Sequence, residues 1–366
     1  MLFRSRAAVH DAPMPLRRRA LEIVLGHLLE CRRPAREIAV WLGPVRDDPA
    51  FRDLIDAQPE EVRRELRRRF PADTEDIRLL LAEGEPARAL YFLFARRDHC
   101  DPELLLEALE KLADIGPPSD DPDLFYDIFD IILLLEKATH IDRTRLVHLE
   151  FALFPVLRVP GGGAPADALF EDVTSDPETF VEFLKAAFPA EGEPARNVED
   201  FSVEFAERAY EVVRSCYRIP GQRPDGTIDA EVLAAFVDRV RELARKAGRP
   251  TVCDRHLGQI LAHAPEDPDG VWPCRAVAAL LDRANLEDVR FGFLLGVQKG
   301  RGVVTRRHDE GGEQERALAE KYRKRADRLA TEFARVAPTL RELAETYERE
   351  ARWADEELRS RLEGLR

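Results

Sequence analysis

Residues 101–135 read DPELLLEALEKLADIGPPSDDPDLFYDIFDIILLL, a helix, a break and a second helix. Asp101 and Pro102 suit a helix start, because aspartate accepts from free backbone N–H groups and proline loses no hydrogen bond there. One face of the first helix is apolar: Leu104, Leu105, Ala108, Leu109 and Leu112. The second helix, 124–135, is apolar on nearly all sides, which predicts the most buried helix of this region.

The same alternation extends in both directions along the chain. Asp73 provides a similar start signal ahead of Ile77, and proline or glycine breaks recur every ten to twenty residues. This spacing is typical of stacked helix pairs, although no repeated consensus is present. Two long charged helices, 313–336 and 339–363, are expected to be separated at Pro338 and to fold on each other. The sequence therefore predicts an all-α protein, an irregular helical array of solenoid-like pairs that ends in a long antiparallel helical hairpin.

Two polar or flexible breaks divide this array. Val159-Pro160-Gly161-Gly162-Gly163-Ala164-Pro165 has the composition of a linker, and a second break lies near Glu191-Gly192-Glu193-Pro194. We therefore expect an N-terminal helical array over 1–160, a linker with short helices over 161–197, and a C-terminal helical domain over 198–366.

Composition indicates a folded bacterial protein of the cytoplasm. The chain is 45% hydrophobic and 34% charged, and arginine greatly outnumbers lysine. Five scattered cysteines without CxxC spacing suit a reducing compartment. The N-terminal apolar run is interrupted by Glu22 and His27, as in an amphipathic helix rather than a signal peptide. No run approaches the length of a membrane span, so no membrane association is expected.

Charge is unevenly distributed. Residues 1–70 carry 15 basic and 11 acidic side chains, whereas residues 71–200 carry 11 basic and 29 acidic ones. Because an acidic middle repels phosphates, nucleic acid is not expected along the whole chain. Binding of nucleic acid at the ends, or of a basic protein, remains compatible with this distribution.

The motifs of common enzymes are missing from the sequence. It has no Walker A sequence, no G-x-S-x-G elbow, no H-E-x-x-H and no G-x-G-x-x-G after a strand. We therefore expect neither catalysis nor a cofactor.

Two short segments resemble metal sites incompletely. Residues 224–231 resemble part of a calcium loop, but the first, third and last ligand positions hold no carboxylate, so a glycine turn followed by an Asp229 N-cap is favoured. A Cys/His cluster comprises Cys253, His256, His263 and Cys274. Its spacing matches no common zinc motif, so ordinary packing is favoured and no metal is expected.

The segment 296–308, GVQKGRGVVTRRH, has the strongest functional character. Its cationic residues, with no acid among them, are Lys299, Arg301, Arg306, Arg307 and His308. Glycines 296, 300 and 302 let a ligand approach the backbone closely, which suggests an anion or nucleic-acid contact. The alternative is a glycine-rich turn with solvated arginines. Trp272, upstream in the sequence, is expected to pack near this segment.

The block from about 201 to 357 carries DGTIDAE, GQILAHAPEDPDGVWPCR, GVQKGRGVVTR and DEGGEQERALAEKYR. It is similar to an uncharacterised helical module of larger bacterial proteins. That resemblance implies a module rather than an enzyme core, and it implies no activity.

These observations favour a non-enzymatic interaction or regulatory module, with another protein as its partner, in a bacterial multi-component assembly such as an immunity or signalling system. The alternative is a nucleic-acid-binding protein that uses the basic N-terminal segment (Arg17–Arg19 and Arg63–Arg69) together with the 299–308 loop.

Overall fold

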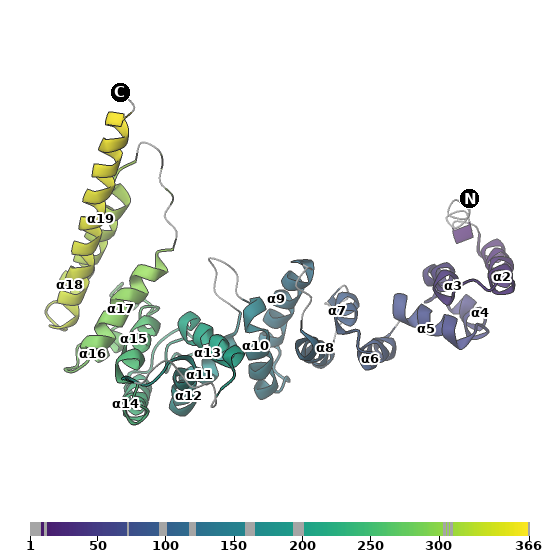
Figure 1. Cartoon of the computed structure of the whole chain (residues 1–366), viewed down its shortest axis with the longest axis horizontal. Helices are drawn as coiled ribbons and strands as arrows, with labels where there is room; N and C mark the ends of the chain where they lie inside the picture. Colours follow the sequence, from purple (N-terminus) through teal and green to yellow (C-terminus); the bar gives the residue numbers. More distant parts are fainter. Residues whose placement is uncertain are drawn as a thin grey trace. The chain divides into compact units, whose positions relative to one another are not determined.

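Every regular element in the described part of the chain is helical, as predicted (Figure 1). The computed structural model describes residues 9–10, 13–71, 73–94, 101–116, 122–157, 165–192, 201–302, 305, 307 and 310–364. The chain divides into two compact units, Met1–Ile141 and Asp142–Arg366. Most of the predicted linker and much of the second predicted break, residues 158–164 and 193–200, lie outside the described residues. The three predicted domain ranges therefore remain a prediction.

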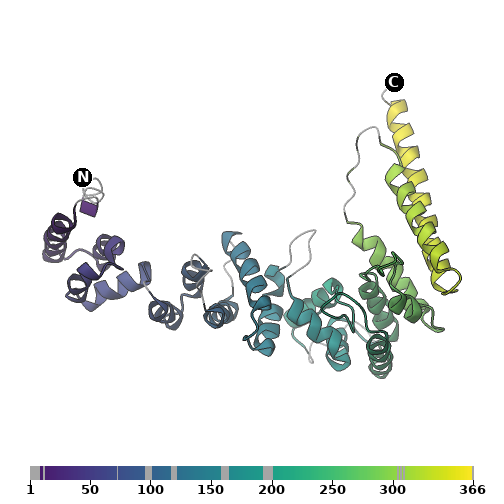
Figure 2. The same ribbon diagram turned by 180° about the vertical axis from the view of Figure 1, so that it is seen from behind.

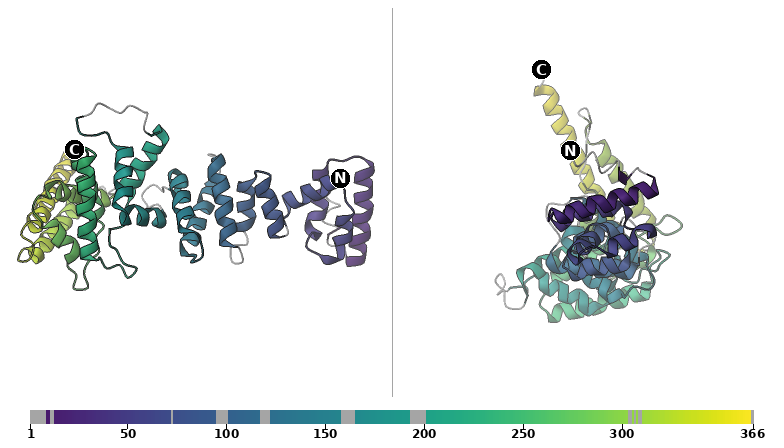
Figure 3. Two further views of the ribbon diagram at one scale, coloured as in Figure 1. Left: turned by 90° about the horizontal axis from the view of Figure 1, so that it is seen from below. Right: turned by 90° about the vertical axis from the view of Figure 1, so that its right-hand side faces the viewer.

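The first unit is a row of short helices, in which successive helices pack on one another. Figure 3 (left) shows them following each other in sequence order, from purple to blue. They are α2 (Met14–Glu30), α3 (Ala35–Leu42), the 3-10 turns η1 (Gly43–Val45) and η2 (Pro49–Phe51), α4 (Arg52–Asp56), α5 (Glu60–Arg69), α6 (Thr74–Ala82), α7 (Pro86–Phe94), α8 (Pro102–Ile115) and α9 (Pro122–Lys137).

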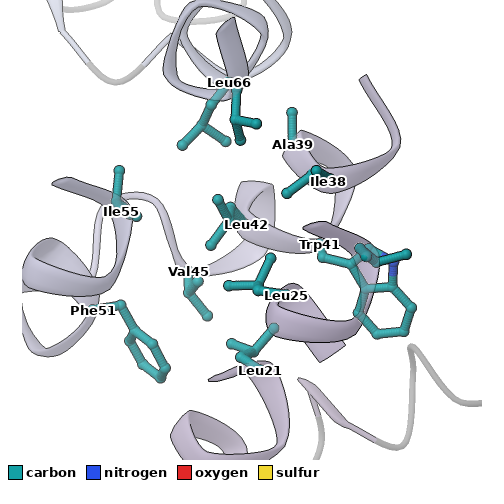
Figure 4. Close-up of a cluster of buried hydrophobic side chains, with 12 residues drawn as sticks. Leu21, Leu25, Ile38, Ala39, Trp41, Leu42, Val45, Phe51, Ile55 and Leu66 are labelled. Carbon is teal, nitrogen blue, oxygen red and sulfur yellow. The ribbon is translucent and has the colours of Figure 1, made fainter. Parts of the chain in front are cut away.

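Helices α2 to α5 bury a common hydrophobic cluster (Figure 4). Leu21 and Leu25 of α2 meet Leu42 of α3 there, and Phe51 and Leu66 complete it. All five side chains are almost fully buried. Burial of leucine and phenylalanine side chains stabilises a fold by about 1.5–3 kcal/mol each, so this cluster holds the N-terminal helices together.

The expectation for residues 124–135 is wrong in one respect. Ile128, Ile131 and Leu135 of α9 are fully buried, but Tyr126 is 72% exposed and Leu134 is 39% exposed. Helix α9 packs on α7 and α8, so neighbouring helices cover only part of its circumference. Helix α9 is therefore hydrophobic around most of its circumference, but other helices contact only part of it.

The second unit contains α10 (Arg143–Leu157), α11 (Asp167–Ser175), α12 (Pro177–Ala187), α13 (Val203–Ser215), α14 (Ala230–Lys246), α15 (Pro250–Leu261), α16 (Arg275–Leu281), α17 (Glu287–Gly300), α18 (Glu313–Leu329) and α19 (Val336–Gly364). The closest associations are α18 with α19 and α15 with α17. Figure 2 shows α18 and α19 as the antiparallel hairpin that the sequence predicts.

The predicted helix starts are confirmed. Asp101 accepts a hydrogen bond from the backbone N–H of Glu103 (3.0 Å), and Asp73 accepts one from Asp76 (3.0 Å). Asp229 accepts from the N–H groups of the second and third residues of α14, at 3.0 and 3.1 Å. These contacts satisfy backbone donors that the helix itself leaves free.

The break in the hairpin lies before Pro338 rather than at it. Helix α18 ends at Leu329, and α19 begins at Val336. Pro338 therefore lies in the first turn of α19, where a proline removes no intrahelical hydrogen bond.

Glycines hold α15 and α17 unusually close together. A Cβ atom on Gly292 would lie 2.7 Å from the Cα of Arg255, and one on Gly296 would lie 2.6 Å from the Cβ of Ala262. One on Gly258 would lie 2.5 Å from a backbone nitrogen of α17. The two backbones approach each other so closely that any side chain at these positions would overlap the neighbouring helix.

Candidate functional site

The predicted 299–308 site is divided between different surroundings. Lys299 lies in the last turn of α17, and Arg301 follows the end of that helix. The backbone N–H of Arg307 donates to Glu310 (3.1 Å). Arg306 and His308 lie outside the described residues. Gly296 and Gly300 belong to α17, so the predicted glycine-rich loop is in part a helix, with its amides in helical geometry.

Arg301 bridges the end of α17 and the terminal hairpin. Its guanidinium pairs with the fully buried carboxylate of Glu315 in α18 and with Glu350 in α19 at 3.1 Å. It also lies 5.4 Å from the ring centroid of Tyr347. Arg301 is therefore compensated by two carboxylates of the protein itself.

Lys299 lies in a different setting. Its Nζ donates to the Oε1 of Gln259 at 2.6 Å. Burial lowers the pKa of Lys299, and the positive charge of Arg214 lowers it further. Lys299 and Arg301 thus have different partners within the protein.

The predicted basic N-terminal segment is also partly neutralised by its own neighbours. Arg18 pairs with Glu22 at 3.1 Å and with Asp53. The arginines of α5 at positions 63, 67, 68 and 69 pair with the glutamates at 60, 65 and 85. These ion pairs reduce the positive potential that phosphates would meet.

Three members of the Cys/His cluster, Cys253, His256 and Cys274, are buried, whereas His263 is exposed. Cys253 is fully buried, and the ring of His256 lies 5.0 Å from that of Phe188. Across the described ranges, no three His, Cys, Asp or Glu side chains are placed to hold a metal. Burial lowers the pKa of His256 to about 4 and lowers that of His263, so both imidazoles are neutral at pH 7.

One concave surface of the second unit is a cleft of about 520 Å³, called here the aromatic cleft. It lies between the α15–α17 pair and the hairpin. Its lining is Ala262, His263, Ala264, Glu266, Trp272, Gly296, Val297, Gly300, Arg301, Leu318, Lys321, Tyr322, Arg325 and Tyr347.

Three largely buried rings form the floor of the aromatic cleft: Trp272, Tyr322 and Tyr347 are 8%, 7% and 2% exposed. Tyr322 and Tyr347 are stacked, with ring centroids 5.7 Å apart and an interplanar angle of 13°. Trp272 meets Tyr322 edge to face at 5.9 Å and donates its indole N–H to the carbonyl of Ala264 at 2.8 Å. Burial raises the pKa of Tyr347 to about 12, so the floor is uncharged at neutral pH.

Charged side chains surround this floor. The guanidinium of Arg325 lies 4.3 Å from the centroid of Trp272 and pairs with Glu266. Lys321 is exposed, and its Nζ lies 5.8 Å from the Tyr322 centroid. Within the described ranges no carboxylate oxygen lies within 4.0 Å of Lys321. The lining therefore combines three cations with one carboxylate in a molecule whose net charge is −14.

The lining of the aromatic cleft contains the side chains that are common on binding surfaces. Tyrosine, tryptophan and arginine are the side chains that most often contribute to protein–protein binding energy. An apolar floor with a polar rim is also the usual composition of such surfaces.

Sequence reasoning placed Trp272 near this segment but missed the remainder of the site. Trp272 does line the same cleft as Gly300 and Arg301, as predicted. The contribution of Tyr322 and Tyr347 to this cleft was not predicted from the sequence. Nothing in the local spacing indicated that the hairpin would lie against α17, because that contact joins residues about 50 positions apart.

Comparison with known proteins gives no relative from which a function can be transferred. No protein-family model matches the chain, and neither a curated protein nor a solved structure is significantly similar to it. No helix among the described residues is long and apolar enough to cross a membrane.

Proposed function

We propose that this chain is a non-enzymatic helical interaction module and that a partner protein docks in its aromatic cleft. The observation that carries the proposal is the three-ring floor of Trp272, Tyr322 and Tyr347 with Arg325 and Lys321 beside it. The exposed edges of these ordered rings, with an arginine beside them in a concave surface, suit a protein segment, because contact with ordered side chains costs little conformational entropy.

The faces of these rings are already occupied. Tyr322 stacks on Tyr347, and Arg325 covers Trp272. Stacking of a nucleobase needs an open ring face, whereas an inserted side chain can pack against ring edges. Together with the paired arginines of α5, this favours a protein partner over nucleic acid.

We place the module in the bacterial cytoplasm, within a multi-component assembly. The arginine-rich composition and the scattered cysteines support this placement; Cys31, Cys216, Cys253 and Cys274 are free in the structure. A helical array with a concave binding surface suits a component of such an assembly.

Site-specific photo-crosslinking tests the proposal. A photo-crosslinking phenylalanine derivative at His263, on the exposed wall of the cleft, should capture a protein in cells of the native organism. The same group at Lys324, which is 74% exposed on α18 and outside the cleft, serves as the control. Protein adducts formed at His263 and absent at Lys324 would support the proposal, and equal labelling at both positions would contradict it.

Nuclease treatment separates the two classes of partner. The lysate is treated with nuclease before irradiation, and protein adducts that still form come from direct binding. If the adducts no longer form after nuclease and nucleic acid co-purifies from the untreated lysate, the alternative of nucleic-acid binding gains support. In that case binding should weaken steeply with salt, and Arg306→Ala combined with Arg307→Ala should reduce it.

A further inference from the structure

The ion pairs around the aromatic cleft leave one cation unmatched. Arg325 has Glu266, and Arg301 has Glu315 and Glu350. Lys321 has no carboxylate within 4.0 Å in the part of the chain that the structure describes, although Glu320 precedes it in sequence. Glu320 instead pairs with Arg323 at 2.9 Å and with Lys324 at 3.4 Å. Lys321 is therefore the cation that is available to an incoming ligand.

The charge of Lys321 lies beside the apolar part of the aromatic cleft. Its Nζ lies 5.8 Å from the ring centroid of Tyr322, and Leu318, one helical turn earlier on α18, lines the same cleft. A carboxylate bound by Lys321 therefore lies near Leu318, one turn away on the same helix, and near the Tyr322 ring. A ligand that carries an acid and an apolar group on neighbouring residues matches both features at once.

The surrounding charges limit how acidic that ligand can be. Glu266 lines the cleft, and Glu350 lies beside Arg301 with 45% of its side chain exposed. A strongly acidic segment or a dianionic phosphate would be repelled by these carboxylates and by the net charge of −14. A single carboxylate opposite Lys321 avoids that repulsion.

We infer that the aromatic cleft recognises a segment of a partner protein in which one Asp or Glu lies next to an aromatic or large aliphatic residue. Lys321 binds the carboxylate, and the apolar side chain packs on Leu318 and on the exposed edges of Trp272 and Tyr322. This inference rests on the proposed function and adds the chemistry of the partner.

Peptide selection tests it with defined probes. A phage-displayed library of random twelve-residue peptides is selected on the full chain, and enriched peptides are labelled with fluorescein for polarisation measurements. The enriched peptides should share an acid beside a Phe, Tyr, Trp, Leu or Ile. Lys321→Gln should weaken their binding about fivefold, the effect of losing one exposed charge pair worth about 1 kcal/mol.

Matched controls isolate the pairing. Lys324→Gln removes the same charge from an exposed site outside the cleft and should change affinity less than twofold. Replacing the peptide's Asp or Glu by Asn or Gln should weaken binding to the wild-type chain about fivefold, yet should have little effect in Lys321→Gln. That non-additivity shows that the two groups interact.

Other outcomes overturn the inference in distinguishable ways. The enriched peptides could lack an acid, with binding that is abolished by Leu318→Glu but unaffected by Lys321→Gln. That result would refute recognition of a carboxylate by Lys321 and leave the proposed function intact. Equal losses of peptide affinity in Lys321→Gln and Lys324→Gln would also refute recognition of a carboxylate by Lys321. Selection that enriches no peptide would refute it as well. If a labelled thymidine oligonucleotide binds and peptides do not, the proposed function fails as well.

Discussion

The guanidinium carbon of Arg325 lies 4.3 Å from the centroid of the Trp272 ring, and the same guanidinium pairs with Glu266. This contact joins α18 to the segment that follows α15, more than fifty residues earlier. Arg325 therefore positions the floor of the aromatic cleft as well as contributing to its charge.

Replacing Arg325 should loosen that floor. Arg325→Gln loses the cation–π contact and the partly buried ion pair, and we expect the free energy of unfolding to fall by about 1–2 kcal/mol. Urea unfolding followed by far-UV circular dichroism measures this change. Lys324→Gln, on the same helix, should leave the midpoint nearly unchanged. Equal effects of the two substitutions would show that the Trp272 contact is not stabilising.

The close contact between α15 and α17 predicts that alanine substitutions at two glycines of α17 differ greatly in their effect on stability. Gly292→Ala places a methyl group against the backbone of Arg255, and we expect a loss on the order of 3 kcal/mol because neither backbone can move aside easily. A Cβ on Gly300 meets no atom within 4 Å, so Gly300→Ala should be neutral or stabilising by less than about 1 kcal/mol. Thermal unfolding of the two variants tests this, and similar melting temperatures would contradict it.

The Arg301–Glu315 pair predicts a double-mutant effect. Arg301→Met removes a cation from beside the fully buried Glu315 carboxylate, and we expect a destabilisation of about 3 kcal/mol. Adding Glu315→Gln removes the buried charge and should recover at least half of that loss. Urea unfolding of the single and double variants gives the coupling energy. Strictly additive losses would show that the two side chains stabilise the hairpin independently.

The imidazole of His256 predicts a pH dependence. Burial and the charge of Lys299 lower its pKa from 6.5 to about 4 in the folded protein. Between these values the unfolded chain binds more protons, so stability falls as pH decreases through this window. The contribution of His256 to this loss should be on the order of 2 kcal/mol between pH 7 and pH 5.

His256→Phe removes this titration. Unfolding free energies of the variant, measured at pH 7 and pH 5, should therefore fall less on acidification than those of the wild-type chain. If the unfolding free energies of both proteins depended on pH in the same way, His256 would have the same pKa in the folded and unfolded states.

The helical elements and many of their boundaries could be predicted from the amino-acid sequence alone. Asp73, Asp101 and Asp229 cap helices through hydrogen bonds to residues two or three positions away, so the local sequence contains all the information needed. The amphipathic faces of α8 and of the terminal hairpin could likewise be predicted, because the helical repeat fixes which residues share a face.

Tertiary structure decided what those elements do. Gly296 was interpreted as part of a ligand loop, but it packs in α17 against α15, and no local pattern distinguishes the two roles. Arg301 and Lys321 are both exposed cations by sequence. Only the packing of the hairpin gives Arg301 two carboxylates and leaves Lys321 beside the aromatic floor. Contacts between residues tens of positions apart depend on how helices pack, and helical periodicity does not encode that packing.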